Sequence, residues 1–126
     1  MKPRFTMRGV KPRSTGRVMS GRLTEGVLKY LNMLGHFAYR SQNMGRQLPN
    51  GRWINPRGIR GVPDITGIAK DGKALFCEVK FGKDKMSIYQ TDFRQRVETR
   101  GGYFIEAHSI DDVMEWHNRI FEGSGK

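Results

Sequence analysis

The sequence has little of several features that define other classes of protein. It contains a single cysteine, Cys77, which excludes an internal disulfide and a cysteine-rich zinc site. It has no apolar run near the roughly 18 residues of a transmembrane helix, so we expect no membrane span. The N-terminus is basic but lacks the apolar stretch of a secretory signal, so we expect a cytoplasmic protein.

Acidic residues are scarce in one half of the chain. The sequence has 23 Lys and Arg and 12 Asp and Glu, which gives a formal net charge of +11. Residues 1–63 hold 13 of the basic residues and one acid, Glu25, whereas residues 64–126 hold ten basic and eleven acidic residues. A basic field of this size suits a polyanion, and nucleic acid is the first candidate. The alternative is a solubilising surface with a basic arm.

Length and apolar periodicity predict one domain behind a basic arm. At 126 residues the chain has room for one modest core. Residues 1–22 contain seven basic residues, no acid and little periodicity, so we expect a flexible N-terminal arm. Apolar residues recur at helical spacing over 23–34, which predicts a helix. Residues 23–122 would form the single domain, followed by a flexible tail over 123–126.

The remaining segments predict a mixed α/β domain. Alternation over 36–41 predicts a strand, and residues 42–62 form a long connection before a β-hairpin. Helices are predicted over 87–99 and 110–121, on either side of a strand over 103–107. The order is then helix, three strands, helix, strand and helix.

The hairpin brings two carboxylates together. Residues 65–69 and 73–79 have strand character and are joined by turn residues. The hairpin would deliver Asp64, Glu78 and the ammonium group of Lys80 to one place. Two carboxylates can hold a hard divalent cation, and a lysine beside them can stabilise a phosphoryl transition state.

The length of the turn decides whether the two carboxylates share a face of the sheet. A two-residue Asp71-Gly72 turn would pair Asp64 with Val79 and point Asp64 away from Glu78. A three-residue loop over 70–72 pairs Asp64 with Glu78 and puts glycine at the left-handed position of the loop. The chemistry therefore favours the three-residue loop.

These residues resemble the signature of the PD-(D/E)xK nuclease superfamily. More narrowly, the run from Gly61 to Asp64, then Glu78-Val79-Lys80, then Gln90 look like the VRR-NUC family, the virus-type replication-repair nucleases. The resemblance covers roughly residues 23–107. It implies a mixed central β-sheet flanked by helices, the restriction-endonuclease-like core.

The resemblance also implies roles for individual residues. Lys80 would position or activate a water molecule, and Gln90 would support the site. The implied ligands of Mg²⁺ or Mn²⁺ are the side chains of Glu25, Asp64 and Glu78 and the main-chain carbonyl of Val79.

Two of these residues have a structural alternative. Glu25 lies in the first turn of the predicted helix, where an acid complements the helix dipole. Gln90 follows Ser87 at the spacing of a capping box, but it also shares a helical stripe with Phe93 and Val97 and could face the sheet. The two roles of Gln90 exclude each other if its side chain must reach back to the cap. We assign no histidine to a metal site.

Basic residues outside the motif predict contacts with DNA phosphates. The connection over 42–62 carries arginines around Trp53, which fits phosphate contact combined with base stacking. The alternative for Trp53 is packing against the body of the protein or a partner subunit. The predicted DNA-binding residues are Arg40, Arg46, Arg52, Arg57, Arg60, Lys83 and Lys85.

The sequence thus predicts a Mg²⁺-dependent DNA endonuclease in the cytoplasm of a bacterial or virus-infected cell. The resemblance implies that stand-alone members act as homodimers on branched DNA, in the manner of Holliday junction resolvases. Two alternatives stay open: a non-specific or restriction-type endonuclease on linear duplex, and a basic DNA-binding protein without catalysis. The set of Glu25, Asp64, Glu78 and Lys80 favours an enzyme.

Overall fold

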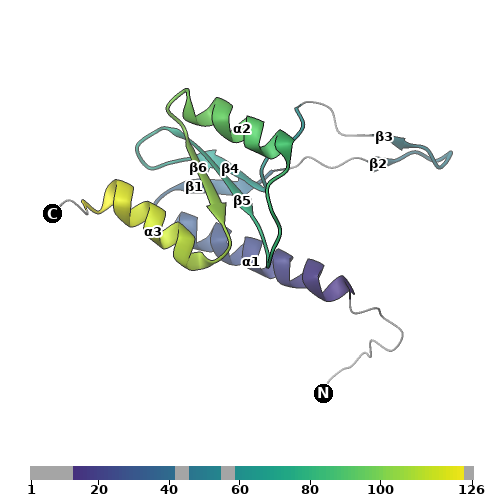
Figure 1. Ribbon diagram of the computed structural model, residues 1–126, viewed down its shortest axis with the longest axis horizontal. Coiled ribbons are helices and arrows are strands. Elements are labelled where there is room, and N and C mark those ends of the chain that lie inside the picture. The colour runs from purple at the N-terminus through teal and green to yellow at the C-terminus, as the bar shows by residue number, and fades with distance from the viewer. Residues whose placement is uncertain (1–12, 42–45, 55–58, 124–126) are drawn as a thin grey trace, which may run out of the picture.

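The computed structural model describes residues 13–41, 46–54 and 59–123 (Figure 1). The helices in these ranges are α1 (Arg13–Met33), α2 (Ile88–Glu98) and α3 (Ile110–Phe121). The strands are β1 (Phe37–Arg40), β2 (Arg46–Gln47), β3 (Trp53–Ile54), β4 (Ile65–Ile68), β5 (Ala74–Val79) and β6 (Tyr103–Ala107). Apart from β2 and β3, this order is the one predicted from the sequence.

A mixed four-stranded sheet forms the centre of the domain, in the order β1-β4-β5-β6. The pairs β1–β4 and β4–β5 are antiparallel, whereas β5 and β6 are parallel. A parallel pair needs a crossover connection, and α2 provides it. Figure 1 shows α2 on one side of the sheet and α1 and α3 on the other. The predicted mixed sheet flanked by helices is confirmed.

The β4–β5 hairpin has the predicted register. Ile65 pairs with Cys77, and one further step of the same register places Asp64 opposite Glu78. The Ala69 amide donates to the Lys73 carbonyl at 2.8 Å, which closes a three-residue loop over 70–72. Gly72 has φ +93°, the left-handed conformation that favours glycine. The two carboxylates therefore share one face of the sheet.

Different helices pack on the two faces of the sheet. The core face packs against α1 and α3, and its buried cluster includes Val27, Leu31, Ile65, Leu75, Cys77, Ile105, Val113 and Trp116. The opposite face, which we call the α2 face, carries Phe76, Glu78 and Phe104. Phe93 of α2 lies 5.0 Å from Phe76 and 6.5 Å from Phe104 between ring centroids. Because strand side chains alternate, buried Cys77 points away from Glu78.

The first helix begins earlier than predicted. α1 starts at Arg13, so residues 13–22, which we predicted as part of the flexible arm, are helical. The prediction was wrong there because apolar periodicity begins only at Leu23, and the preceding turns carry Gly16 and Gly21. The rest of the predicted arm, residues 1–12, and the end of the predicted tail, residues 124–126, lie outside the described residues.

The predicted 42–62 connection contains a short antiparallel ribbon. β2 and β3 pair with Arg46 opposite Ile54 and Gln47 opposite Trp53. Figure 1 shows this ribbon projecting from the body of the domain. Strands of two residues are too short to leave a clear alternation in the sequence, so the ribbon was not predicted. None of the three described helices is long and apolar enough to cross a membrane.

Candidate active site

Asp64 stands directly before β4 and is held in place by its neighbours on both sides. Its Oδ2 accepts a hydrogen bond from the Val79 amide at 3.0 Å, across the hairpin. Its main-chain carbonyl accepts from the Ser41 amide at 2.8 Å, which ties it to the end of β1. The hairpin register thus holds the Asp64 carboxylate at the end of β5, and the contact with Ser41 holds its main chain.

Glu78 is the most constrained carboxylate of the site. Only 4% of the residue is exposed. Its Oε2 accepts from Gln90 Nε2 at 2.8 Å and lies 3.2 Å from Lys80 Nζ. Its Oε1 is buried and has no hydrogen-bond partner among the described residues. Because an unpaired buried polar atom is costly, Glu78 Oε1 is available to a ligand that supplies positive charge.

The surroundings of Glu78 disfavour its charge. Burial, and then the negative charge of Asp64, raise the pKa of Glu78 to about 7, against the opposing effect of Lys80. A cation bound between the two carboxylates would remove the repulsion and favour ionised Glu78. The donor set is made of carboxylate oxygens, which suits a hard divalent cation. The residues present therefore fit the Mg²⁺ or Mn²⁺ that the resemblance implies.

Gln90 fills both of the roles that the sequence left in competition. Its side-chain Oε1 accepts from the main-chain amide of Ser87 at 2.8 Å. The Ser87 Oγ accepts from the main-chain amide of Gln90 at 3.1 Å, which completes the capping box. Its Nε2 donates to Glu78 at 2.8 Å. The expectation that the roles exclude each other was wrong, because the two ends of one amide group serve the two partners. The cap therefore positions the amide that holds Glu78.

Glu25 is not brought into this cluster. Its Oε2 lies 3.3 Å from Arg40 Nη1, and both side chains are about half exposed, at 55% and 50%. Within the described ranges, no group of three or more His, Cys, Asp or Glu side chains is arranged to hold a metal ion. The structure thus brings together Asp64, Glu78, Lys80 and Gln90. The role of Glu25 as a further ligand stays a prediction.

The predicted DNA-binding residues are only partly described. Arg40, Arg52, Arg60, Lys83 and Lys85 are exposed, as phosphate contacts require. Arg57 lies outside the described residues, and so do the side chains of Arg46 and Trp53. The Val79 carbonyl remains a predicted ligand.

A contact between the loop before β4 and the start of α2 was not predicted from the sequence. The Arg60 guanidinium lies 4.6 Å from the centre of the Tyr89 ring. Gly61 has φ +82°, and a Cβ there would overlap the main chain of Tyr89 and Gln90. Glycine is required by this close approach, which seats the loop against the helix that carries Gln90. The glycine in the motif was a visible signal, but its partner could not be read from the sequence.

Comparisons with solved structures give a likeness of fold. No model of a known protein family and no curated protein matches the sequence. A solved structure described as a "VRR_NUC domain" matches with a TM-score of 0.59 and 21% sequence identity. The match covers 81% of this chain and 97% of that one. The chain therefore has a VRR-NUC-like fold, as the motif predicted.

Proposed function

We propose that this protein is a metal-dependent DNA endonuclease that hydrolyses phosphodiester bonds in branched DNA. One observation carries the proposal: a buried glutamate, Glu78, has one oxygen without a partner in the described part of the chain, and it lies beside a second fixed carboxylate, Asp64, and a lysine. A residue with only a structural role would be expected to have both oxygens satisfied. The fold likeness to a VRR_NUC domain supports the same conclusion.

Asp64 and Glu78 would hold Mg²⁺ or Mn²⁺ through oxygen atoms. Such an ion neutralises a phosphate and lowers the pKa of a bound water molecule. Glu25 remains our proposed third side-chain ligand, with the Val79 carbonyl as a further one. The exposed salt bridge between Glu25 and Arg40 contributes about 0–1 kcal/mol, so a bound cation can compete for that carboxylate.

Lys80 and Gln90 would position the reacting groups. The Lys80 side chain is largely buried, and its ammonium group lies on the same face as Glu78. From there it would orient the attacking water or stabilise charge that develops on the phosphate. Gln90 would keep Glu78 in one orientation, because its amide is itself held by the cap of α2.

The preference for branched DNA and a homodimer forms the second part of the proposal. Resolving a four-way junction needs two coordinated cuts, and a two-fold dimer is the commonest way to supply two sites. Exposed basic residues contact phosphates without reading bases, which suits recognition of shape. A restriction-type or non-specific endonuclease on linear duplex would use the same catalytic residues. A basic DNA-binding protein without catalysis would not need the unpartnered Glu78 oxygen.

A cleavage assay tests the proposal. A four-way junction, a matched linear duplex and a matched single strand would be incubated with the protein in Mg²⁺ or in EDTA, with Asp64→Asn as an isosteric control. We expect Mg²⁺-dependent cleavage that favours the junction and is lost in the variant. Light scattering at micromolar concentration should give twice the 14.5 kDa chain mass.

The outcomes separate the parts of the proposal. Absence of cleavage in Mg²⁺ and in Mn²⁺ would overturn the nuclease assignment. Equal cleavage of branched and linear DNA by a monomer would overturn the resolvase assignment alone. Calorimetry adds an independent readout, because Asp64→Asn should remove Mg²⁺ binding.

A further inference from the structure

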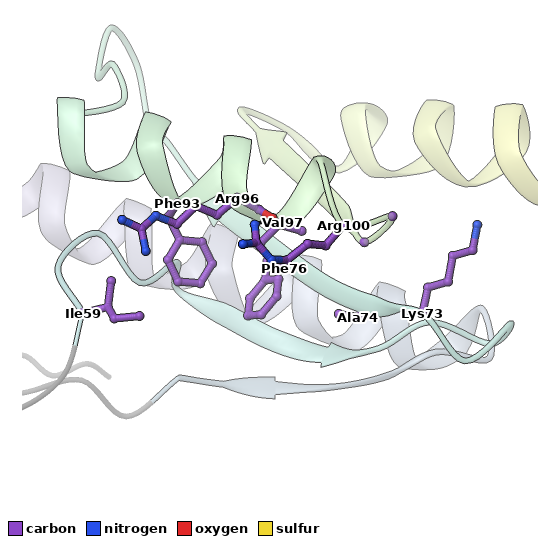
Figure 2. Close-up of a pocket in the computed structure, with 10 residues that line it drawn as sticks. Ile59, Lys73, Ala74, Phe76, Phe93, Arg96, Val97 and Arg100 are labelled. Atoms are coloured by element: carbon purple, nitrogen blue, oxygen red, sulfur yellow. Dashed lines mark hydrogen bonds between the residues drawn. The ribbon is translucent and has the colours of Figure 1, made fainter.

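A separate pocket lies on the α2 face, at the start of β5. Its volume is about 320 Å³, which is within the range of small-ligand pockets, ~300–1,000 Å³. Figure 2 shows Phe93 pointing from α2 toward the sheet, with Ile59 at one end of the pocket and Lys73 at the other. The lining residues used below are Ile59, Lys73, Phe76, Phe93, Arg96 and Arg100.

The floor of the pocket is apolar and aromatic. The Phe76 and Phe93 rings meet edge to face, with centroids 5.0 Å apart and an angle of 80°. Ile59, which is 55% exposed, closes one side. A flat ring entering here would lie against aromatic and aliphatic carbon, the kind of surface on which nucleobases stack.

Positive charge surrounds this apolar floor. Arg96 is paired with Asp92 at 3.0 Å, and Arg100 Nη1 donates to the Arg96 carbonyl at 3.0 Å. Lys73 lies 5.4 Å from the centre of the Tyr103 ring. Within the described part of the chain, neither Arg100 nor Lys73 forms an ion pair within 4.0 Å, although Asp71 is near Lys73. The complementary ligand has a flat apolar ring joined to an anion, which is the chemistry of a nucleotide.

The pocket and the candidate active site share one strand. Phe76 is two residues before Glu78 on the same face, and Ala74, also in the pocket lining, is four residues before it. At about 3.3 Å per residue, these positions lie roughly 7 and 13 Å from Glu78 along β5. A DNA strand that has one phosphate at Glu78 would therefore place a nearby nucleotide over the pocket.

We propose that this pocket holds an unpaired nucleobase of the strand that is cut, with Lys73 and Arg100 on its flanking phosphates. The proposal rests on the proposed function and deepens it, because it specifies that the branched DNA has an unpaired nucleotide close to the cut, where the branch interrupts the stacked duplex. A base inside a continuous duplex is stacked and paired, so it cannot enter without being extruded.

A binding experiment without cleavage tests the pocket by itself. The probe is a DNA duplex with one unpaired 2-aminopurine, compared with the same duplex carrying an abasic residue at that position, both in EDTA. We expect the wild type to bind the base-containing DNA about tenfold more tightly, which corresponds to about 1.4 kcal/mol and to the stacking of one base on aromatic side chains. The 2-aminopurine fluorescence should change on binding.

Two variants and a control locate the effect. Ala74→Leu should fill the pocket and bring the affinity ratio close to one. Arg100→Gln should weaken binding of the base-containing DNA more than the matched control Arg119→Gln, which removes the same charge from the end of α3. If Ala74→Leu does not fold, the comparison of the two arginine variants still decides the matter.

The results distinguish this proposal from the proposed nuclease function. An affinity ratio of one in the wild type, or equal effects of the two arginine variants, would overturn the pocket even if the protein cuts DNA. A base-dependent ratio in a protein that cuts nothing would support the pocket and overturn the nuclease assignment. A change in the mass of the protein caused by Ala74→Leu, with an unchanged ratio, would show that a second copy occupies the pocket and would overturn the proposal.

Discussion

The two faces of the central sheet differ in how far their apolar side chains are buried and their polar groups are hydrogen-bonded. On the core face, buried apolar residues are enclosed by α1 and α3, and the buried histidines His36 and His117 have partners. On the α2 face, Glu78 has an oxygen without a partner among the described residues, and large apolar side chains stay exposed. The exposed set on β1 and β4 is Phe37, Tyr39 and Ile68. The core face thus stabilises the fold, whereas the α2 face keeps groups available for ligands.

The buried pair His36 and His117 shows that polar groups on the core face have hydrogen-bond partners. His36 Nδ1 accepts from the Lys70 amide at 3.0 Å, so the proton of neutral His36 is on Nε2. That nitrogen then donates to His117 Nδ1 at 3.0 Å, and His117 Nε2 donates to Glu122 at 3.1 Å. Every ring nitrogen has a partner, and the chain of bonds links the hairpin loop to the residue after α3.

The largest expected effect separates catalysis from DNA binding on the α2 face. Lys80→Ala should lower the cleavage rate by about 10²–10³-fold, the size expected for loss of a group that stabilises transition-state charge. Binding of DNA should change little, because Lys80 is one of 23 basic residues. Lys29→Ala on α1 removes the same charge as a control. Equal loss of binding and cleavage in Lys80→Ala would contradict the assigned role.

The next effect compares the stability of the two faces directly. Leu31→Ala on the core face should lower the free energy of unfolding by about 2–5 kcal/mol, because Leu31 is fully buried and leaves a cavity. Phe37→Ala on the α2 face should change it by only about 0.5 kcal/mol, since Phe37 is 62% exposed. Urea unfolding measures both. Similar losses in the two variants would show that Phe37 is covered in solution.

A smaller effect concerns pH and the core face. Burial, and then the charges of His117 and Lys70, lower the pKa of His36 from 6.5 to about 4. Between these values the unfolded chain binds more protons than the folded one, so His36 contributes stability above pH 6.5 that is lost toward pH 4. His36→Gln should make the fall in unfolding free energy between pH 6.5 and pH 4 less steep. If urea unfolding shows the same fall in unfolding free energy between pH 6.5 and pH 4 in the variant and the wild type, the assigned effect of His36 is wrong.

Local patterns in the sequence predicted the hairpin and its two carboxylates, but not the contacts between distant segments. Strand alternation and turn residues left two turn lengths open, and the chemistry of the two carboxylates selected the three-residue loop that pairs Asp64 with Glu78. The bond between His36 and His117 joins residues 81 positions apart, so no local spacing indicates it. The pairing of Glu25 with Arg40 likewise depends on how α1 packs beside β1. The double role of Gln90 depends on the geometry of an amide between a helix cap and the sheet.

The α2 face holds Glu78 in surroundings that disfavour its negative charge, and we propose that a bound metal ion relieves this cost. The pKa of Glu78 is raised from 4.5 to about 7, so the folded state binds more protons than the unfolded one in this window. Stability should therefore fall as the pH rises from 4.5 to 7. Glu78→Gln removes this loss, so the variant should gain more stability relative to the wild type at pH 8 than at pH 5.

The most direct test measures unfolding free energy and cleavage in the same Glu78→Gln protein at pH 8. We expect the variant to be more stable than the wild type without metal, Mg²⁺ to stabilise the wild type alone, and cleavage to be lost. A variant that is less stable than the wild type at pH 8, or that still cuts DNA in Mg²⁺, would overturn the proposed metal site.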